Sequence, residues 1–468
     1  MTEDADYTKP HSLLIKNARL INGLGAVQNH LQNIYIEGGE ITEIGQNISS
    51  HEVQVLDVAG STVMPGLIDA HVHLQSVPGS VFRKDSEETL QKYRYQQLRA
   101  YLACGVTTVL DNAISASMLR EFNDYLSAGG TGPRLYALAP AFYPPDGYLD
   151  HDMLTPYWGP QWRSAANEHD IQALFDEYEG IENIVGVKTM LETGFGKSNI
   201  WPLHSPEIRK IIVNEAQKRN LPLYIHAYKE KEQAIGLEMG LHNFVHSGFI
   251  FKQPTSEFMD RMKKQGVYLT TTLSCTFDQM LVNFDIQRLD DEFLRLTVPE
   301  EMLKTARDLK AWNEYYNSFF KNSSPKWIPS FIIKGITKIM NIEKMIRSCL
   351  LNASKAIVTM HKAGIPIVVG TDASSWLVFL NFFHGPSTIR EIELLGNAGI
   401  PPIDVISSAT KIPSEMMGLE KLIGTVEIGK RADLIVVQDD PLENLSALKS
   451  LSWVIKEGEA RTPIEWMK

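Results

Sequence analysis

Short apolar runs alternate with amphipathic stretches through the middle of this chain. Several of the runs follow segments of helical periodicity such as "SPEIRKIIVNEAQKRN". Eight runs are candidate strands: "GLIDAHVHL", "GVTTVLDNA", "RLYALAPAF", "IVGVKTM", "LPLYIHAY", "NFVHSG", "VYLTTTL" and "IPIVVGTDA". Short buried strands that alternate with helices predict a parallel sheet. Eight of them predict an α/β fold, a (β/α)8 TIM-like barrel whose chemistry gathers at the carboxyl ends of its strands.

The two ends of the chain have a different pattern. The segments "SLLIKNARLI", "NIYIEGGEITEIG" and "LSWVIKEGEAR" carry alternating apolar positions broken by Gly and Asn turns. This alternation predicts short β-strands with one buried face. We expect the two ends to pair into one small composite β-sandwich domain, made of residues 1–65 and 423–468, with the barrel formed by residues 66–422.

A long segment at about residues 277–348 interrupts the alternation of strands and helices. A βα connection of this length in a barrel is typically a lid or a wall of the substrate pocket. Its Ile-rich second half, punctuated by Lys, leaves contact with a membrane surface as the alternative. Its aromatic residues favour a bulky apolar substrate or simply pack the segment onto the barrel; they are Trp312, Tyr315, Tyr316, Phe319, Phe320 and Trp327.

Composition narrows the choice of partners and compartment. The 45 Lys and Arg against 56 Asp and Glu give a net charge of −11, which argues against nucleic acid as a partner. The three scattered cysteines fit neither a disulfide framework nor a CxxC metal site. The chain shows neither a signal-peptide pattern nor a run of about eighteen apolar residues. We therefore expect no transmembrane segment and a cytoplasmic protein, with a trimmed signal peptide and an extracytoplasmic location as the alternative.

Histidines and one aspartate stand at the ends of the predicted strands. His71 and His73 alternate along one strand, so their side chains point to the same face and can bind one ion together. His226 and His246 each end a later strand, and Asp372 ends a very apolar one, where a buried carboxylate needs a partner. Ordinary strand histidines with local partners remain the alternative for each.

Lys188 ends the apolar run "IVGVK", where an unpaired ammonium group would be costly. One interpretation is a lysine that forms an ion pair or extends to solvent. The other is a lysine carboxylated by CO₂, which would be an anionic ligand able to bridge two cations.

These motifs, taken in order with "MPGLIDAHVHL" and the C-terminal "GTVEIGKRADLIVVQDDPLENL", resemble the amidohydrolase superfamily, in particular its imidazolonepropionase-like branch of prolidase-like and ochratoxinase-like amidases. The resemblance covers almost the whole chain except the insertion. It implies two divalent metal ions, for which zinc suits the ligands best, although Mn, Co, Fe or Ni can replace it. The implied ligands are His71, His73 and Asp372 for one ion and His226 and His246 for the other, with Lys188 as the carboxylated bridge. A mononuclear site without Lys188 and His246 is the alternative.

Four further residues are candidates for positions near the substrate. Tyr228 matches a family position near the substrate carbonyl, with a packing role as the alternative. His384 either contacts substrate or supports the residues that do, with an exposed loop histidine as the alternative. Many relatives carry Gly-Gly-His where this chain has "YPPDGYLDH", which places Tyr148 in the position of the histidine and His151 close by. Tyr148, His151 and His384 are the candidate substrate-binding residues, and the departure weakens any transfer of dipeptide specificity.

The resemblance predicts a metal-dependent hydrolase that cleaves an amide bond of an N-acyl amino acid, dipeptide or aryl amide. The attacking group is a hydroxide generated between the two ions, with Asp372 as proton acceptor and donor and Tyr228 holding the oxyanion. Lactone or ester hydrolysis and ring-opening of a cyclic amide are the alternatives within enzymes, and a non-catalytic binding barrel is the alternative outside them. We expect a small-molecule substrate and a homo-oligomer.

Overall fold

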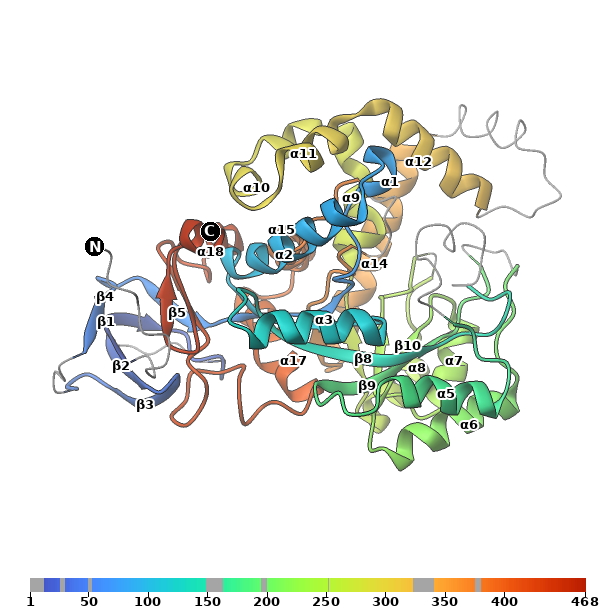
Figure 1. Ribbon diagram of the computed structural model, residues 1–468, viewed down its shortest axis with the longest axis horizontal. Helices are drawn as coiled ribbons and strands as arrows, with labels where there is room; N and C mark the ends of the chain where they lie inside the picture. The colour runs from blue at the N-terminus through green and yellow to red at the C-terminus, as the bar shows by residue number, and fades with distance from the viewer. Residues whose placement is uncertain are drawn as a thin grey trace.

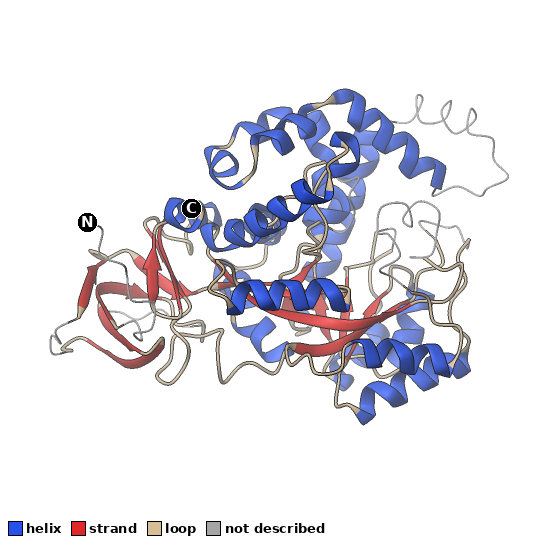
Figure 2. Ribbon diagram, viewed as in Figure 1, coloured by secondary structure: helices blue, strands red, loops and turns tan. Residues whose placement is uncertain are grey.

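The computed structural model describes residues 12–25, 30–48, 53–148, 163–194, 200–250, 252–322, 341–374 and 380–468. Two sheets dominate this part of the chain, and Figure 2 shows them as separate bodies joined by a short connection. One is the predicted barrel, surrounded by helices. The other is built from both ends of the chain.

The barrel sheet consists of parallel strands that follow one another in chain order. In the described residues it contains β6 (Leu67–Val72), β7 (Val106–Asp111), β8 (Arg134–Phe142), β9 (Ile184–Met190), β10 (Leu223–His226), β11 (Asn243–Val245), β12 (Tyr268–Thr270) and β13 (Ile367–Val368). A parallel bridge between Val72 and Ala373 joins the first strand to the segment after the last, which closes the ring. The predicted (β/α)8 barrel is confirmed.

Helices connect the strands and cover the outside of the barrel (Figure 1). They are α2 (Glu87–Ala103), α3 (Ala116–Ser127), α5 (Glu168–Glu177), α6 (Pro206–Lys218), α7 (Glu230–Glu238), α8 (Ser256–Gln265), α14 (Ile342–Lys362), α15 (Pro386–Ala398), α16 (Pro402–Ser408) and α17 (Lys411–Met416). Side-chain caps start several of them, because a hydroxyl oxygen can accept a free backbone N–H of the first turn. Ser205 accepts from Ile208 in this way, directly before a proline at the first helical position.

The second sheet confirms that the two chain ends fold together. Its strands are β1 (Leu13–Leu20), β2 (Gln32–Glu37), β3 (Glu40–Gly45), β4 (Gln54–Asp57), β5 (Thr62–Pro65), β14 (Leu434–Val437), β15 (Leu451–Lys456) and β16 (Glu459–Arg461). The N-terminal β5 pairs antiparallel with the C-terminal β14, and this contact joins the two ends. A short helix, α18 (Pro463–Trp466), follows the last strand.

The described part of the long insertion is helical. After β12 come the π-helix η2 (Ser274–Asp278), α9 (Gln279–Leu281), the 3-10 helices η3 (Val282–Phe284) and η4 (Ile286–Asp290), α10 (Glu292–Thr297), α11 (Glu300–Arg307) and α12 (Leu309–Asn322). In Figure 1 these helices lie at the top of the view, on the same side as the short helix α1 (Ser80–Arg83).

Three of the insertion aromatics singled out above, Trp312, Tyr315 and Tyr316, are buried. Trp312, Tyr315 and Tyr316 pack in one apolar cluster with Val77 from the segment after β6 and Leu380 from the segment after β13. These three side chains therefore pack the insertion onto segments that follow barrel strands, and they are not part of an exposed apolar surface. The side chains of Phe319 and Phe320, and all of Trp327, lie outside the described residues. Among the described helices, none is long and apolar enough to cross a membrane.

Candidate metal centre

The six residues singled out as metal ligands all lie at one end of the barrel. His71 lies in β6 and His73 directly follows it, Lys188 lies in β9, His226 ends β10, and His246 and Asp372 follow β11 and β13. Because the strands are parallel, their carboxyl ends meet at the same rim. All six side chains are buried there. The fold thus brings together residues that are spread over about three hundred positions of the sequence.

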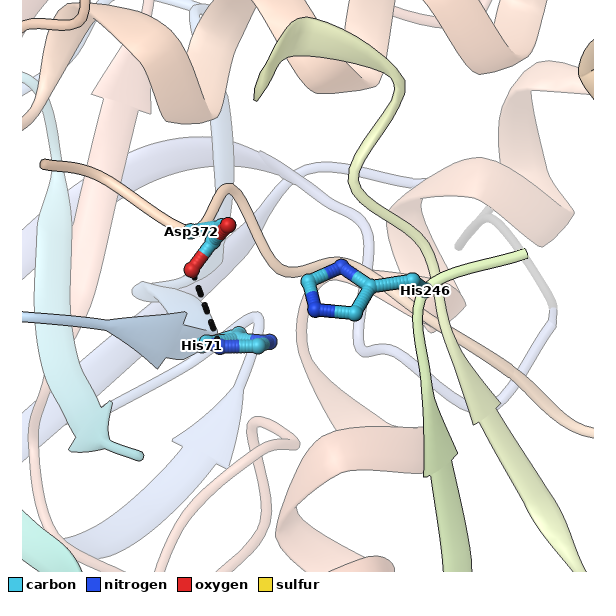
Figure 3. A group of neighbouring side chains, drawn as sticks. All are labelled: His71, His246 and Asp372. Carbon is cyan, nitrogen blue, oxygen red and sulfur yellow. Dashed lines mark ion pairs between the residues drawn. The ribbon is translucent and has the colours of Figure 1, made fainter. Parts of the chain in front are cut away.

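His71, His73 and Asp372 are in direct contact. The Oδ1 atom of Asp372 lies 3.1 Å from Nε2 of His71 and 2.9 Å from Nε2 of His73, and Figure 3 shows the first of these contacts as a dashed line. Burial alone would raise the pKa of Asp372, but the adjacent His71 and His73 hold this pKa well below its usual value. Burial lowers the pKa of His71 to about 3, so this imidazole is neutral and able to bind a cation.

His246 completes a group that could hold a metal ion. One ligand atom from each of His71, His246 and Asp372 lies within 4.8 Å of the others, and Figure 3 shows the three side chains converging from separate segments. The Nδ1 atom of His246 is 2.8 Å from Oγ1 of Thr272, so the protein already engages this side of the ring. A histidine whose second nitrogen is held by a protein group is typical of metal ligands.

His226 lies next to His246. Their ring centroids are 4.7 Å apart, and burial lowers the pKa of His226 to about 3. Two predicted neighbours stack on these rings: Tyr228 lies 4.9 Å from His246, and Tyr148 lies 4.9 Å from His226. The structure therefore places both tyrosines directly against the candidate ligands.

Lys188 lies fully buried among these residues. Burial lowers its pKa to about 7, and the nearby carboxylates of Asp372 and Asp111 oppose that shift. The lysine charge also contributes to the lowered pKa values of His71, His226 and His246, so its ammonium group lies within electrostatic range of all three rings. This setting matches neither a surface lysine nor one that extends to solvent.

Two of the candidate ligands have a left-handed backbone. The φ angle is 77° at His246 and 68° at Asp372, a conformation that residues other than glycine adopt infrequently. Such strain is usually found where a side chain must be aimed at a functional site. At both positions it turns the chain sharply just after a strand, toward the shared centre.

The structure gives the remaining predicted site residues different settings. His384 is buried, and both of its ring nitrogens already have protein partners: Nδ1 lies 2.9 Å from the Tyr101 hydroxyl, and Nε2 lies 3.2 Å from Ser76 O and from Ser374 N. These contacts make His384 a link between segments rather than an exposed loop residue with a free nitrogen for substrate. His151 lies outside the described residues.

Three neighbours of the centre were not singled out from the sequence. The Sγ atom of Cys275 lies 3.1 Å from Oδ2 of Asp372, the oxygen that does not face the histidines. Thr272 holds His246, and Oε2 of Glu192 lies 3.4 Å from Nε2 of His226. The one sequence signal for Glu192 and Thr272 was their position at the end of a predicted strand.

The donor set suits a divalent cation. Four imidazoles and one carboxylate are the nitrogen and oxygen ligands that zinc and related ions prefer. In the described structure Nε2 of His71 and Nε2 of His73 both approach Oδ1 of Asp372, at 3.1 and 2.9 Å. Ligand atoms of two buried imidazoles and one buried carboxylate that meet in this way fit a divalent cation.

A barrel that gathers buried histidines, a lysine and an aspartate at the carboxyl ends of its strands defines a class of hydrolytic enzymes with a candidate metal site. The amidohydrolase family model matches residues 62–460, and the chain belongs to this family. Membership of this family indicates a hydrolase that acts on carbon–nitrogen bonds, and enzymes of the family are generally metal-dependent.

Solved structures of the same fold cover the chain almost completely. A Xaa-Pro dipeptidase with bound methionine in its active site is 22% identical, with a TM-score of 0.69 over 96% of this chain and 99% of that one. The ochratoxinase of A. niger is 18% identical, with a TM-score of 0.67 over 96% of each chain. At these identities the likeness shows the fold.

A curated relative matches over a short segment. The dihydroorotase of Clostridium botulinum (strain Eklund 17B / Type B) is 43% identical over 75 residues, which is 16% of this chain and 18% of that protein. This match is too short to carry the activity of the whole relative to this chain.

Proposed function

We propose that this protein is a metal-dependent hydrolase that cleaves the amide bond of an N-acyl amino acid, a dipeptide or an aryl amide. The observation that carries the proposal is the convergence of His71, His246 and Asp372, with one ligand atom from each within 4.8 Å of the others. His73, His226 and Lys188 lie around this group. The family membership and the dipeptidase fold likeness support the choice of an amide.

The ligand assignment is the one that the family resemblance implies, and the contacts of Asp372 with His71 and His73 and of His226 with His246 support it. His71, His73 and Asp372 would hold one ion, and His226 and His246 would hold the other, with zinc as the preferred metal. Lys188 would bridge the two after carboxylation. CO₂ reacts with a neutral amine to form a carbamate and release a proton, and burial lowers the pKa of Lys188 to about 7, which favours the neutral form.

Metal ions bound there would supply a water of lowered pKa and polarise the scissile carbonyl. The protein contributes the proton transfers: Oδ2 of Asp372, the oxygen that is not in contact with His71 and His73, would accept the proton of the attacking water and then deliver it to the leaving amine. Tyr228, stacked on His246, would donate its hydroxyl proton in a hydrogen bond to the developing oxyanion.

Tyr148 and Trp201 would form an apolar wall of the substrate pocket. Their ring centroids are 5.1 Å apart, and Tyr148 also stacks on His226. An aromatic wall beside the reacting carbonyl favours substrates with a bulky apolar group on one side of the amide. The insertion would close over this pocket as a lid.

The class of reaction is tested by offering the zinc-loaded protein a pooled library of dipeptides, N-acyl amino acids, aryl amides and lactones and following each by mass spectrometry. Loss of amides with release of their amines, abolished by a chelator and restored by zinc, is the expected result. Turnover of lactones or cyclic amides alone would replace the proposed substrate class, and turnover that survives full metal removal would contradict the mechanism.

A further inference from the structure

Glu192 lies beside the candidate metal centre without a part in the mechanism above. It follows β9 at a distance of four residues from Lys188, and its side chain is fully buried. An unpaired buried carboxylate is costly, so the partners of this side chain bear on what it does.

The strand register places Glu192 next to His226. Met190, the last residue of β9, pairs with His226 at the end of β10, and the backbone N–H of Leu191 donates to the carbonyl of His226 at 2.8 Å. The chain therefore passes directly alongside His226 just before it reaches Glu192.

The two carboxylate oxygens of Glu192 have different surroundings. Oε1 accepts the backbone N–H of Gly194 at 2.7 Å, which fixes the orientation of the group. Oε2 lies 3.4 Å from Nε2 of His226. Within the part of the chain that the structure describes, neither of these two buried atoms makes a hydrogen bond of good geometry. Their 3.4 Å contact is therefore a close approach of two polar atoms that each lack a hydrogen bond.

The loop that carries Glu192 is tied to the segment after His226. Oε1 of Glu232 accepts the backbone N–H of Thr193 at 3.0 Å and its hydroxyl at 2.6 Å, and Oε2 accepts the backbone N–H of Lys229 at 2.9 Å. Lys229 also donates from Nζ to the Thr193 hydroxyl at 2.7 Å. These bonds hold the two segments at a fixed separation, so the placement of Glu192 against His226 is built into the loop.

We propose that Glu192 is a positioning residue for the metal centre: its Oε2 accepts the proton on Nε2 of His226 and leaves the Nδ1 lone pair of that ring free for a divalent cation. Metal-binding histidines commonly donate their second N–H to a carboxylate, which fixes both the tautomer and the ring orientation. Thr272 occupies the corresponding place for His246, but with a hydroxyl. The inference rests on the metal centre of the proposed function.

The variants Glu192→Gln and Glu192→Leu distinguish a positioning role from direct ligation. The glutamine retains an oxygen that can accept from His226, whereas the leucine has similar size and no acceptor. Glu215 is the control, since it is also a buried carboxylate but pairs with Lys218 at the end of α6 and with Arg219 directly after it. Wild type, both variants and Glu215→Leu are stripped with a chelator and titrated with Co(II), following its visible absorption and competition with a chromophoric chelator.

We expect Glu192→Leu to bind one of the two ions about 10- to 100-fold more weakly, with altered Co(II) absorption. Glu192→Gln should stay within about fivefold of wild type, and Glu215→Leu should match wild type. Unchanged affinity and absorption in Glu192→Leu would overturn the role of Glu192, and so would an equal loss in Glu192→Gln, since that result means direct ligation. If Glu192→Leu does not fold, Glu192→Ala replaces it and is judged by the same criterion. A wild-type protein that binds no Co(II) would instead overturn the metal centre itself.

Discussion

Replacing Asp372 by asparagine removes the proposed proton acceptor while keeping the shape of the side chain. The backbone at Asp372 is left-handed, with φ of 68°, and asparagine is among the few residues that tolerate this conformation. Its amide oxygen can still accept a hydrogen bond from His71 or His73. We therefore expect Asp372→Asn to fold, and alanine would be the poorer choice because it would add backbone strain.

The expected loss of activity follows from the chemistry that Asp372 supplies. A positioned general acid–base contributes about 10²- to 10⁴-fold to the rate, which corresponds to about 3–5 kcal/mol in the barrier. The neutral amide cannot take the proton of the attacking water at Oδ2, the atom that lies 3.1 Å from Cys275 Sγ. We expect kcat of Asp372→Asn to fall by that factor, while KM changes by less than about tenfold.

The assay measures kcat and KM by amine release on the best amide from the library screen, at saturating zinc. The metal content of each sample is quantified, because asparagine is also a weaker ligand than aspartate. Asp433→Asn is the control, since Asp433 is a buried carboxylate that pairs with Arg134 and not with the site histidines. A fully metallated Asp372→Asn that keeps more than about a tenth of wild-type kcat would refute the proton-transfer role.

Three further predictions concern stability and metal affinity. Lys188→Met should stabilise the metal-free protein in CO₂-free buffer, and the gain in unfolding free energy should be larger at pH 7.5 than at pH 9.5. The pKa of Lys188 is about 7 in the folded protein and 10.5 in the unfolded chain, so the free-energy cost of burying this amine grows as the pH falls. At about 1.4 kcal/mol per pH unit the gain in unfolding free energy at pH 7.5 should exceed the gain at pH 9.5 by about 2–3 kcal/mol. An equal gain at both pH values would refute the buried neutral amine. Thr272→Val should weaken zinc binding about tenfold in a chelator competition, whereas Thr272→Ser should restore it, because only the hydroxyl can hold Nδ1 of His246; equal affinities would argue against this contact. Trp312→Ala should cost about 3–5 kcal/mol in urea unfolding, since Trp312 is buried and donates from Nε1 to Ala306 O, while Leu309→Ala on the same helix should cost less than about 0.5 kcal/mol because Leu309 is 61% exposed.

The barrel was predictable because its strands are short apolar runs with polar residues at their ends. Asp372 is an example: it ends "IPIVVGTDA", where a buried carboxylate stands out against the apolar run. His71 and His73 were recognisable because they alternate along one predicted strand and so share a face. The composite sheet was also predictable, because both ends of the chain carry the alternating pattern of short strands. In the structure β5, which precedes the barrel, pairs with β14, which follows the barrel.

The neighbours of the site depend on contacts that local patterns do not contain. In the sequence "MLETG" Glu192 resembles an ordinary loop residue. Only the pairing of β9 with β10 in the folded chain places it beside His226. Cys275 is one of three scattered cysteines, and only the packing of η2 brings it to Asp372. The setting of His384 depends on Tyr101, which is 283 positions away in the sequence. The homo-oligomer, the cytoplasmic location and the domain boundaries remain predictions.

The most direct test of the account is to count metal ions per chain while measuring turnover. The protein is stripped with a chelator and reconstituted with increasing zinc, and each sample is analysed for bound metal and for amide hydrolysis. We predict saturation at two ions per chain, with activity that rises as the sites fill and no activity in the stripped protein. Saturation at one ion would leave only the mononuclear site, and full activity without metal would contradict the central claim.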